Sequence, residues 1–156
     1  MSEIGIGIVG GGYMGKAHAV AMSSVATVFN TRLRPRLEMV AASSMQSAMR
    51  YRDEFGYARA AKDWQELVTD NRVDAVIIAT PQDSHRAIAE AAIAAGKPVL
   101  CEKPLAETVE DAAAMVAAAE KASVPNMVGF NYIRTPASQF ARNLLKQGEI
   151  GDVTFF

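Results

Sequence analysis

Short apolar runs recur along the chain, separated by longer segments in which apolar residues return every three to four positions. The run at residues 75–79 is continuous rather than alternating, as expected for a strand that is covered on both faces. Strands are predicted at residues 4–9, 37–42, 58–60, 75–79, 99–101, 126–130 and 152–156. Runs of this length, bounded by turn-forming residues, are typical of a buried sheet.

The segments between these runs have helical periodicity. Helices are predicted at residues 13–29, 47–55, 64–69, 84–95, 109–122 and 137–147, and a surface loop at residues 30–35. In residues 109–122, the side chains of Val109, Ala112, Ala113 and Val116 form one apolar stripe, as in a helix that packs on a core. The alternation of strands and helices predicts an α/β domain.

Six strands that alternate with helices predict a doubly wound parallel Rossmann sheet, because parallel neighbours need crossover connections and these are almost always right-handed. We expect the strand order 3-2-1-4-5-6, in which ligands bind beyond the carboxyl ends of the strands. The loops after Val9, Ala42, Ala79, Cys101 and Phe130 would then share one edge of the sheet.

A glycine-rich turn joins the first predicted strand to the first predicted helix. Gly10, Gly12 and Gly15 have the spacing G-x-G-x-x-G. In such a turn the first glycine bends the chain, the second lets a pyrophosphate approach the backbone, and the third lets helix and strand pack closely. The N–H groups around Tyr13 and Met14, with the positive end of the helix dipole, would face the diphosphate. The turn predicts dinucleotide binding, with a purely structural glycine turn as the alternative.

Composition narrows the class of function. The chain has 156 residues, about one domain, and its formal charge of −1 gives no reason to expect nucleic acid or an anionic membrane as partner. Cys101 is the only cysteine, so no internal disulfide can form and a reducing compartment is expected. The first residues lack a basic leader and the apolar runs fall short of the roughly 20 residues of a membrane span. We therefore expect a cytoplasmic protein, and the sequence indicates no metal site.

Glu102, Lys103 and Pro104 follow the fifth predicted strand, beside the expected nucleotide crevice. A lysine at this place can donate hydrogen bonds to a substrate oxygen and stabilise negative charge that develops there. A surface lysine in a strand-to-helix loop is the alternative. Position alone leaves both interpretations open.

Four motifs lie at or just after the expected ligand edge. They are the glycine turn at residues 9–15, Ala79-Thr80-Pro81 with His85, Glu102-Lys103-Pro104, and Gly129-Phe130-Asn131-Tyr132 with Pro136-Ala137. Together they resemble the N-terminal nucleotide-binding domain of the Gfo/Idh/MocA family of NAD(P)-dependent oxidoreductases. The resemblance covers nearly the whole chain, and the Glu-Lys-Pro motif is its most specific element.

The resemblance implies roles for individual residues. Lys103 would be catalytic, lying beside the nicotinamide and the reacting hydroxyl of the substrate. Thr80, Pro81 and His85 would lie along the cofactor, and Glu102 near the nicotinamide ribose. For His85, however, a capping or packing role is the alternative.

Two further residues remain open. His18, about one turn past the glycine turn, is interpreted as a packing residue. Arg134 stands two positions after Tyr132, where many members have arginine directly after the tyrosine, so its substrate role is in doubt.

The adenosine end departs from the NAD-preferring pattern of the family. Such members commonly carry an acidic residue after the second strand, which binds both adenosine ribose hydroxyls. Here Ser43 and Ser44 stand in that place, with Arg50 one to two turns further on. Serines can bind a 2′-phosphate, so we expect NADP to be preferred or both NADP and NAD to be used.

The resemblance also sets the expected organisation. Residues 1–132 would be the dinucleotide-binding domain, and residues 133–156 a connecting helix and the first strand of an α/β substrate domain absent from this chain. The complete protein, a homo-oligomer, would transfer hydride between nicotinamide and a secondary alcohol of a sugar, inositol or related polyol. The chain alone would bind cofactor without turnover. A non-catalytic dinucleotide sensor is the main alternative.

Overall fold

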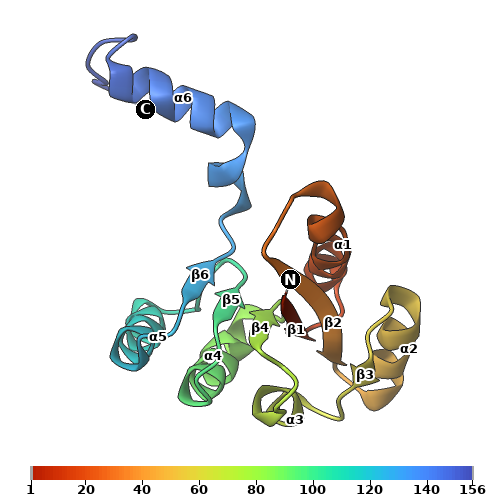
Figure 1. Cartoon of the computed structure of the whole chain (residues 1–156). Helices are drawn as coiled ribbons and strands as arrows, with labels where there is room; N and C mark the ends of the chain where they lie inside the picture. The colour runs from red at the N-terminus through yellow and green to blue at the C-terminus, as the bar shows by residue number, and fades with distance from the viewer. Residues whose placement is uncertain (1, 156) are drawn as a thin grey trace.

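The computed structural model describes residues 2–155 and organises them around one parallel sheet of six strands (Figure 1). The strands are β1 (Ser2–Val9), β2 (Leu33–Ala41), β3 (Arg59–Ala60), β4 (Ala75–Ile78), β5 (Val99–Cys101) and β6 (Asn126–Val128). Their order is β3-β2-β1-β4-β5-β6, so the predicted Rossmann order is confirmed. The carboxyl ends of all six strands therefore lie at one edge of the sheet.

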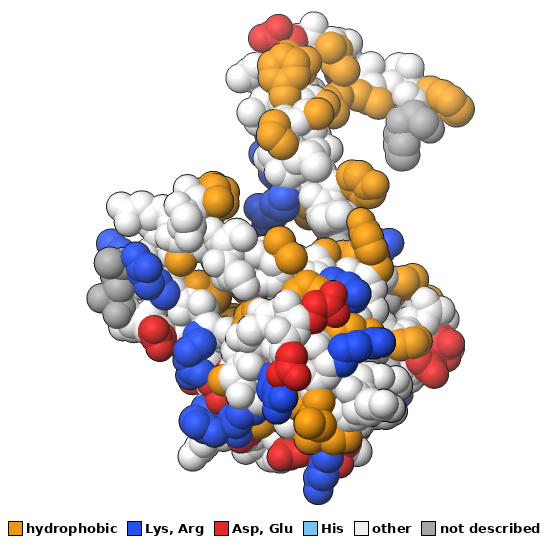
Figure 2. Space-filling view, turned by 90° about the vertical axis from the view of Figure 1, so that its right-hand side faces the viewer, with side chains coloured by type: hydrophobic (Ala, Val, Ile, Leu, Met, Phe, Trp, Pro, Cys, Tyr) orange, Lys and Arg blue, Asp and Glu red, His pale blue; other side chains and the backbone are white. Residues whose placement is uncertain are grey.

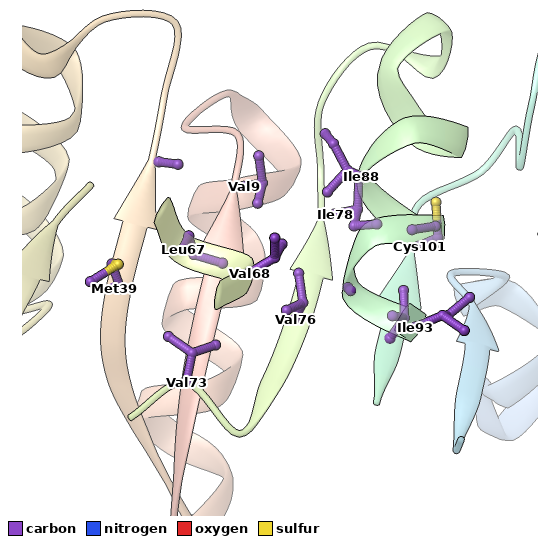
Figure 3. Close-up of a cluster of buried hydrophobic side chains, with 14 of the residues drawn as sticks. Val9, Met39, Leu67, Val68, Val73, Val76, Ile78, Ile88, Ile93 and Cys101 are labelled. Carbon is purple, nitrogen blue, oxygen red and sulfur yellow. The ribbon is translucent and has the colours of Figure 1, made fainter. Parts of the chain in front are cut away.

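Helices cover both faces of this sheet. They are α1 (Tyr13–Val28), α2 (Met45–Phe55), α3 (Trp64–Thr69), α4 (His85–Ala94) and α5 (Val109–Ala122), with a 3₁₀ turn, η1 (Gln82–Ser84), before α4. Side chains of α1 and α2 pack with one set of strand residues, including Ile8 and Ile77. Side chains of α3, α4 and α5 pack with the other set, including Val76 and Ile78 (Figure 3). Both faces of β4 are thus buried, as its continuous apolar run predicts.

Strand β2 begins earlier than predicted, because residues 33–35 belong to the strand and not to the expected loop. Pro35 pairs with Ile4 of β1, while β3 pairs only with Met39 and Val40 on the other side of β2. At Pro35 the strand is therefore an edge strand, where a missing N–H leaves no hydrogen bond unmade. Because a proline argues against a strand in the sequence, the pattern predicts a loop where β2 in fact begins.

An extra residue in β2, Glu38, forms a bulge opposite Ile6 and Gly7. The side chain of Glu38 is buried, yet it is charged, so it needs partners. Arg59 donates from Nε to Glu38 Oε1 at 2.8 Å, and Arg36 contacts Glu38 Oε2. Arg59 in turn forms a bidentate pair with Asp70 at 2.5 and 2.6 Å. This network ties the bulge to the end of α3.

The pair between Arg59 and Asp70 has a predictable pH dependence. The hydrogen bonds from Arg59 lower the pKa of the Asp70 carboxyl to about 2. Asp70→Asn should lower the free energy of unfolding at neutral pH. Since the folded pKa is depressed, this contribution is complete above about pH 4 and is lost as the pH falls toward 2. Urea midpoints of parent and variant should converge over that window; a constant difference would contradict the assignment.

Helix α5 packs through a different stripe from the predicted one. Met115 and Ala119 are its buried residues, whereas Val109 is 80% exposed and Val116 is 48% exposed. The apolar residues of this helix surround most of its circumference because many are alanines. The periodicity therefore does not decide which face meets the sheet.

The C-terminal part stands apart from the sheet. A 3₁₀ turn, η2 (Asn131–Arg134), leads to α6 (Pro136–Gln147), which packs on η2 and projects away from the other helices (Figure 1). No residue of α6 is buried, and Phe140 and Leu145 are exposed. Apolar side chains are visible on the surface of this projecting part (Figure 2). Residues 152–155 form no strand, against the prediction for 152–156, because none of the residues described pairs with them; Phe156 lies outside the described residues.

Candidate functional site

The glycine turn between β1 and α1 is shaped by close backbone approach. Gly10 has φ +106°, donates its N–H to the Ala41 carbonyl at 2.8 Å, and leaves no room for a Cβ beside the backbone of Ala79. A Cβ on Gly15 would collide with the Gly10 carbonyl oxygen. The fold itself therefore requires glycine at both positions.

Gly12 differs from these two glycines. Its φ of −69° is open to any residue, and a Cβ built on it would meet nothing within 4 Å. Gly12 is also the N-cap of α1 and has no side chain that could accept from the first N–H groups of the helix. The hydrogen bonds within the helix begin with Lys16, whose N–H donates to the Gly12 carbonyl at 3.0 Å. The backbone N–H groups of Tyr13 and Met14 thus lie at the positive end of the helix dipole, next to open space.

That space belongs to a cavity of about 820 Å³ at the carboxyl edge of the sheet. Several residues predicted to bind cofactor line it: Gly10, Gly12, Tyr13, Met14, Ser43, Thr80 and Pro81. Other predicted residues do not line it: Gly15, Ser44, His85, Glu102 and Lys103. The cavity joins the turns after β1, β2 and β4, as the switch-point argument predicts.

Among the lining residues without a predicted binding role are Tyr51, Lys62, Asp63 and Trp64. The ring of Tyr51 lies where a Cβ on Gly11 would be, so this glycine makes room for the tyrosine. Asp63 accepts the Glu66 N–H at 2.8 Å and caps α3, as its spacing to Glu66 predicts. Nothing in the local pattern of these residues signals a ligand, because only the sheet order places the start of α3 beside the glycine turn.

In the turn after β2, Ser43 and Ser44 have different surroundings. Ser43 lines the cavity, but the Ser44 hydroxyl accepts the Ser47 N–H at 3.2 Å as the N-cap of α2, which begins at Met45 rather than at residue 47. Ser44 therefore caps α2 and does not line the cavity. Arg50 does not line the cavity, but its guanidinium lies 5.0 Å from the ring centroid of Tyr51, which does.

His85 is a buried packing residue, contrary to the expectation that it lies along the cofactor. Its side chain is 1% exposed. Nε2 lies 2.9 Å from the Thr80 carbonyl oxygen, and Nδ1 lies 3.1 Å and 3.2 Å from those of Pro104 and Leu105. Both ring nitrogens therefore face backbone carbonyls and none faces the cavity.

Glu102 is likewise buried rather than open to a ribose, with 5% of its surface exposed. His18 Nε2 donates to Glu102 Oε1 at 2.8 Å, because a carboxylate only accepts. Gly129 leaves room for this carboxylate, since a Cβ there would lie 2.9 Å from Glu102 Oε1. His18, interpreted from the sequence as a packing residue, thus has Glu102 as a specific hydrogen-bond partner.

Lys103 lies on the exposed side of the same loop, directly after β5 and before Pro104. Within residues 2–155 its ammonium group has no hydrogen bond or ion pair. Cys101, the residue two before it, is buried, and this burial raises the pKa of its thiol to about 12. Lys103 is therefore exposed, whereas the thiol of Cys101 stays protonated and buried.

Tyr132 and Arg134, in the last of the four sequence motifs and just after it, do not line the cavity. Tyr132 is 77% exposed, and Arg134 is also exposed, both in η2 and away from the cavity lining. Within residues 2–155, no three His, Cys, Asp or Glu side chains come together as a metal site, and no helix is long and apolar enough to cross a bilayer.

Comparison with known proteins fits this geometry. Residues 4–130 match the GFO_IDH_MocA family, described as an oxidoreductase family with an NAD-binding Rossmann fold. Levoglucosan dehydrogenase of Pseudarthrobacter phenanthrenivorans is 37% identical over 157 residues, which cover 100% of this chain and 40% of that protein. Inositol 2-dehydrogenase 1 of Saccharopolyspora erythraea is 36% identical, over 94% of this chain and 42% of that protein.

A solved structure has the same fold. Levoglucosan dehydrogenase in complex with NADH and L-sorbose superposes with a TM-score of 0.94 at 38% identity, covering 97% of this chain and 41% of that one. The chain thus spans about 40% of the length of these relatives. On the family match, the sheet order and the glycine turn together, the chain belongs to the Gfo/Idh/MocA family of oxidoreductases.

Proposed function

We propose that the cavity at the carboxyl edge holds a nicotinamide dinucleotide, with its pyrophosphate on the glycine turn. The open space beside Gly12 carries this proposal. Gly12 has an ordinary φ and no protein neighbour that a Cβ would strike, so the fold does not need glycine there. A ligand that lies against the backbone does need it. The uncapped start of α1 supplies N–H groups for the phosphates.

The remaining residues of the cavity fit the two halves of such a ligand. Tyr51, Lys62 and Trp64 supply an aromatic and cationic wall toward the ends of β2 and β3, which suits the adenosine half. Thr80 and Pro81 border the other end, next to the loop of Lys103. We place the nicotinamide half there.

Within a two-domain protein that carries this chain, Lys103 would orient and polarise the substrate hydroxyl. The cofactor supplies the hydride chemistry, and the protein fixes geometry and charge. Among the residues that the structure describes, the Lys103 ammonium has no partner, and it is exposed, so it is free to donate to an oxygen and to stabilise charge developing on it. The substrate would be a sugar, inositol or related polyol, which is the class named by the relatives.

We further propose that the site accepts NADP as well as NAD. No carboxylate lies at the end of β2, where Ala42 and Ser43 line the cavity. Two carboxylates line the cavity elsewhere: Asp63, which caps α3, and Asp83, in η1 after β4. Lys62 lines the wall toward the ends of β2 and β3 and supplies positive charge for a 2′-phosphate. The solved relative at 38% identity holds NADH, so use of NADH is expected to be retained.

A titration of intrinsic fluorescence with NADH and NADPH tests this preference. We expect NADPH to bind at least as tightly as NADH. Lys62→Ala should weaken NADPH about threefold to tenfold and leave NADH nearly unchanged, because only NADPH carries the extra phosphate. Tighter binding of NADH by tenfold to the parent chain would end the proposal of NADP use.

A non-catalytic dinucleotide sensor would use the same turn and cavity. The free ammonium of Lys103 at the nicotinamide end argues for the enzyme, since a sensor has no need of a cation there. The two-domain protein separates these functions directly. Turnover of sugars or polyols with cofactor reduction supports the enzyme, and binding without turnover across that class of substrates supports the sensor.

A further inference from the structure

Both histidines of the chain contact the loop that carries Lys103, and neither lines the cavity. His18 reaches this loop from α1, and His85 reaches it from α4. The residues on both sides of Lys103 are therefore held by an imidazole ring from another element.

The contact from α1 acts through Glu102. His18 donates to Glu102 Oε1 at 2.8 Å, and the other carboxylate oxygen, Oε2, accepts the backbone N–H of Lys103 at 3.2 Å. Side-chain exposure is 16% for His18 and 6% for Glu102, so the contact is shielded from water. A hydrogen bond to a shielded carboxylate is stronger than one at the surface. His18 thus fixes the carboxylate that fixes the Lys103 backbone.

The contact from α4 acts on the other side of Lys103. His85 Nδ1 faces the carbonyl oxygens of Pro104 and Leu105, and Nε2 faces that of Thr80. All three partners only accept hydrogen bonds, and a neutral imidazole carries one N–H, so the tautomer decides whether the ring donates to Thr80 or to the Lys103 loop. The ring therefore spans from the Lys103 loop to Thr80, a residue of the cavity wall.

We propose that His18 and His85 are positioning residues, which hold Lys103 at a fixed place relative to the cofactor cavity. His18 connects the loop to α1, the helix that starts at the glycine turn, and His85 connects it to the turn after β4. Both of these turns border the cavity. Removing the His18 imidazole should loosen the loop without removing a contact to a cavity residue, whereas removing that of His85 also takes away the contact to Thr80. The role rests on the proposed function, in which Lys103 acts on substrate beside the cofactor.

Amide hydrogen exchange of this chain tests the proposal without any activity. The reporter is the Lys103 N–H, because its acceptor is the carboxylate that His18 holds. We expect His18→Leu and His85→Leu each to speed exchange at Lys103 by about tenfold or more, since a charge-assisted or buried hydrogen bond is lost. His18→Gln keeps a side-chain N–H donor and should recover part of the protection.

Lys97 offers a matched control. It is buried and donates to two backbone carbonyls, of Asp70 at 2.5 Å and Val73 at 2.8 Å, at the amino edge of the sheet. Lys97→Met should lower global stability and leave exchange at Lys103 unchanged relative to the rest of the chain. If Lys97→Met accelerates Lys103 as much as the histidine variants do, or if His18→Leu stays within about twofold of the parent, the proposal is overturned. His18→Leu decides the question even where His85→Leu fails to fold.

A second readout separates this proposal from the proposed function. In the two-domain protein, His18→Leu should lower kcat about tenfold with the cofactor dissociation constant little changed, and His18→Gln should restore most of it. If the histidine variants exchange faster at Lys103 but the parent protein shows no turnover, the proposed enzymatic function is rejected and the positioning role is retained. If His18→Leu has normal turnover, the positioning role is rejected and the proposed enzymatic function is retained.

Discussion

The Gly12→Val variant is expected to fold with nearly parental stability and to lose cofactor binding. Gly12 has φ −69° and no neighbour within 4 Å of a Cβ, so the valine meets no protein atom and should change the free energy of unfolding by about 1 kcal/mol at most. The branched side chain would instead occupy the space that a pyrophosphate needs. We expect affinity for NADH and NADPH to fall by about 100-fold or more, as for an overpacked contact. Thermal unfolding and calorimetric titration give the two readouts.

Gly15→Ala is the contrasting variant. A Cβ at this position collides with the carbonyl oxygen of Gly10, so alanine should destabilise the fold by about 1–3 kcal/mol. Its loss of stability should exceed that of Gly12→Val even though the added group is smaller. Equal destabilisation by both variants, or cofactor affinity unaffected in Gly12→Val, would contradict the placement of the ligand.

Lys103→Ala in the two-domain protein should lower kcat by about 10²–10³-fold and leave cofactor affinity nearly intact. The ammonium group is exposed beside the cavity and outside its lining, so it contributes to the reaction and little to dinucleotide binding. Stopped-flow or steady-state absorbance at the nicotinamide band measures the rate, and the titration measures the affinity.

The matched control for this lysine is Lys121→Ala, in the last turn of α5. This variant removes an equal charge at a residue that does not line the cavity, so it should change neither kcat nor cofactor affinity. Unchanged turnover in Lys103→Ala would take Lys103 out of the mechanism. A parallel loss of cofactor affinity would instead make it a binding residue.

The sheet and its ligand edge follow from the sequence because they depend on strong local signals. Continuous apolar runs predict buried strands, and alternation with helices predicts parallel order. The spacing of Gly10, Gly12 and Gly15 then predicts the turn. The structure adds that the fold requires Gly10 and Gly15, whereas a Cβ at Gly12 would meet no protein atom within 4 Å.

What the sequence does not predict depends on contacts between distant segments. His18 and Glu102 are 84 residues apart, and His85 reaches carbonyls 19 and 20 residues away. Backbone carbonyls are present at every residue, so no motif marks those that a histidine will meet. The same holds for Lys62 and Trp64, which the sheet order brings to the cavity.

The central claim, that this chain holds a nicotinamide dinucleotide on its glycine turn, is tested most directly by isothermal titration calorimetry of the parent chain and Gly12→Val. We expect saturable binding of one NADH or NADPH to the parent, and no measurable binding to a Gly12→Val chain that remains folded. Absence of binding to the folded parent, or equal binding to both chains, would contradict it.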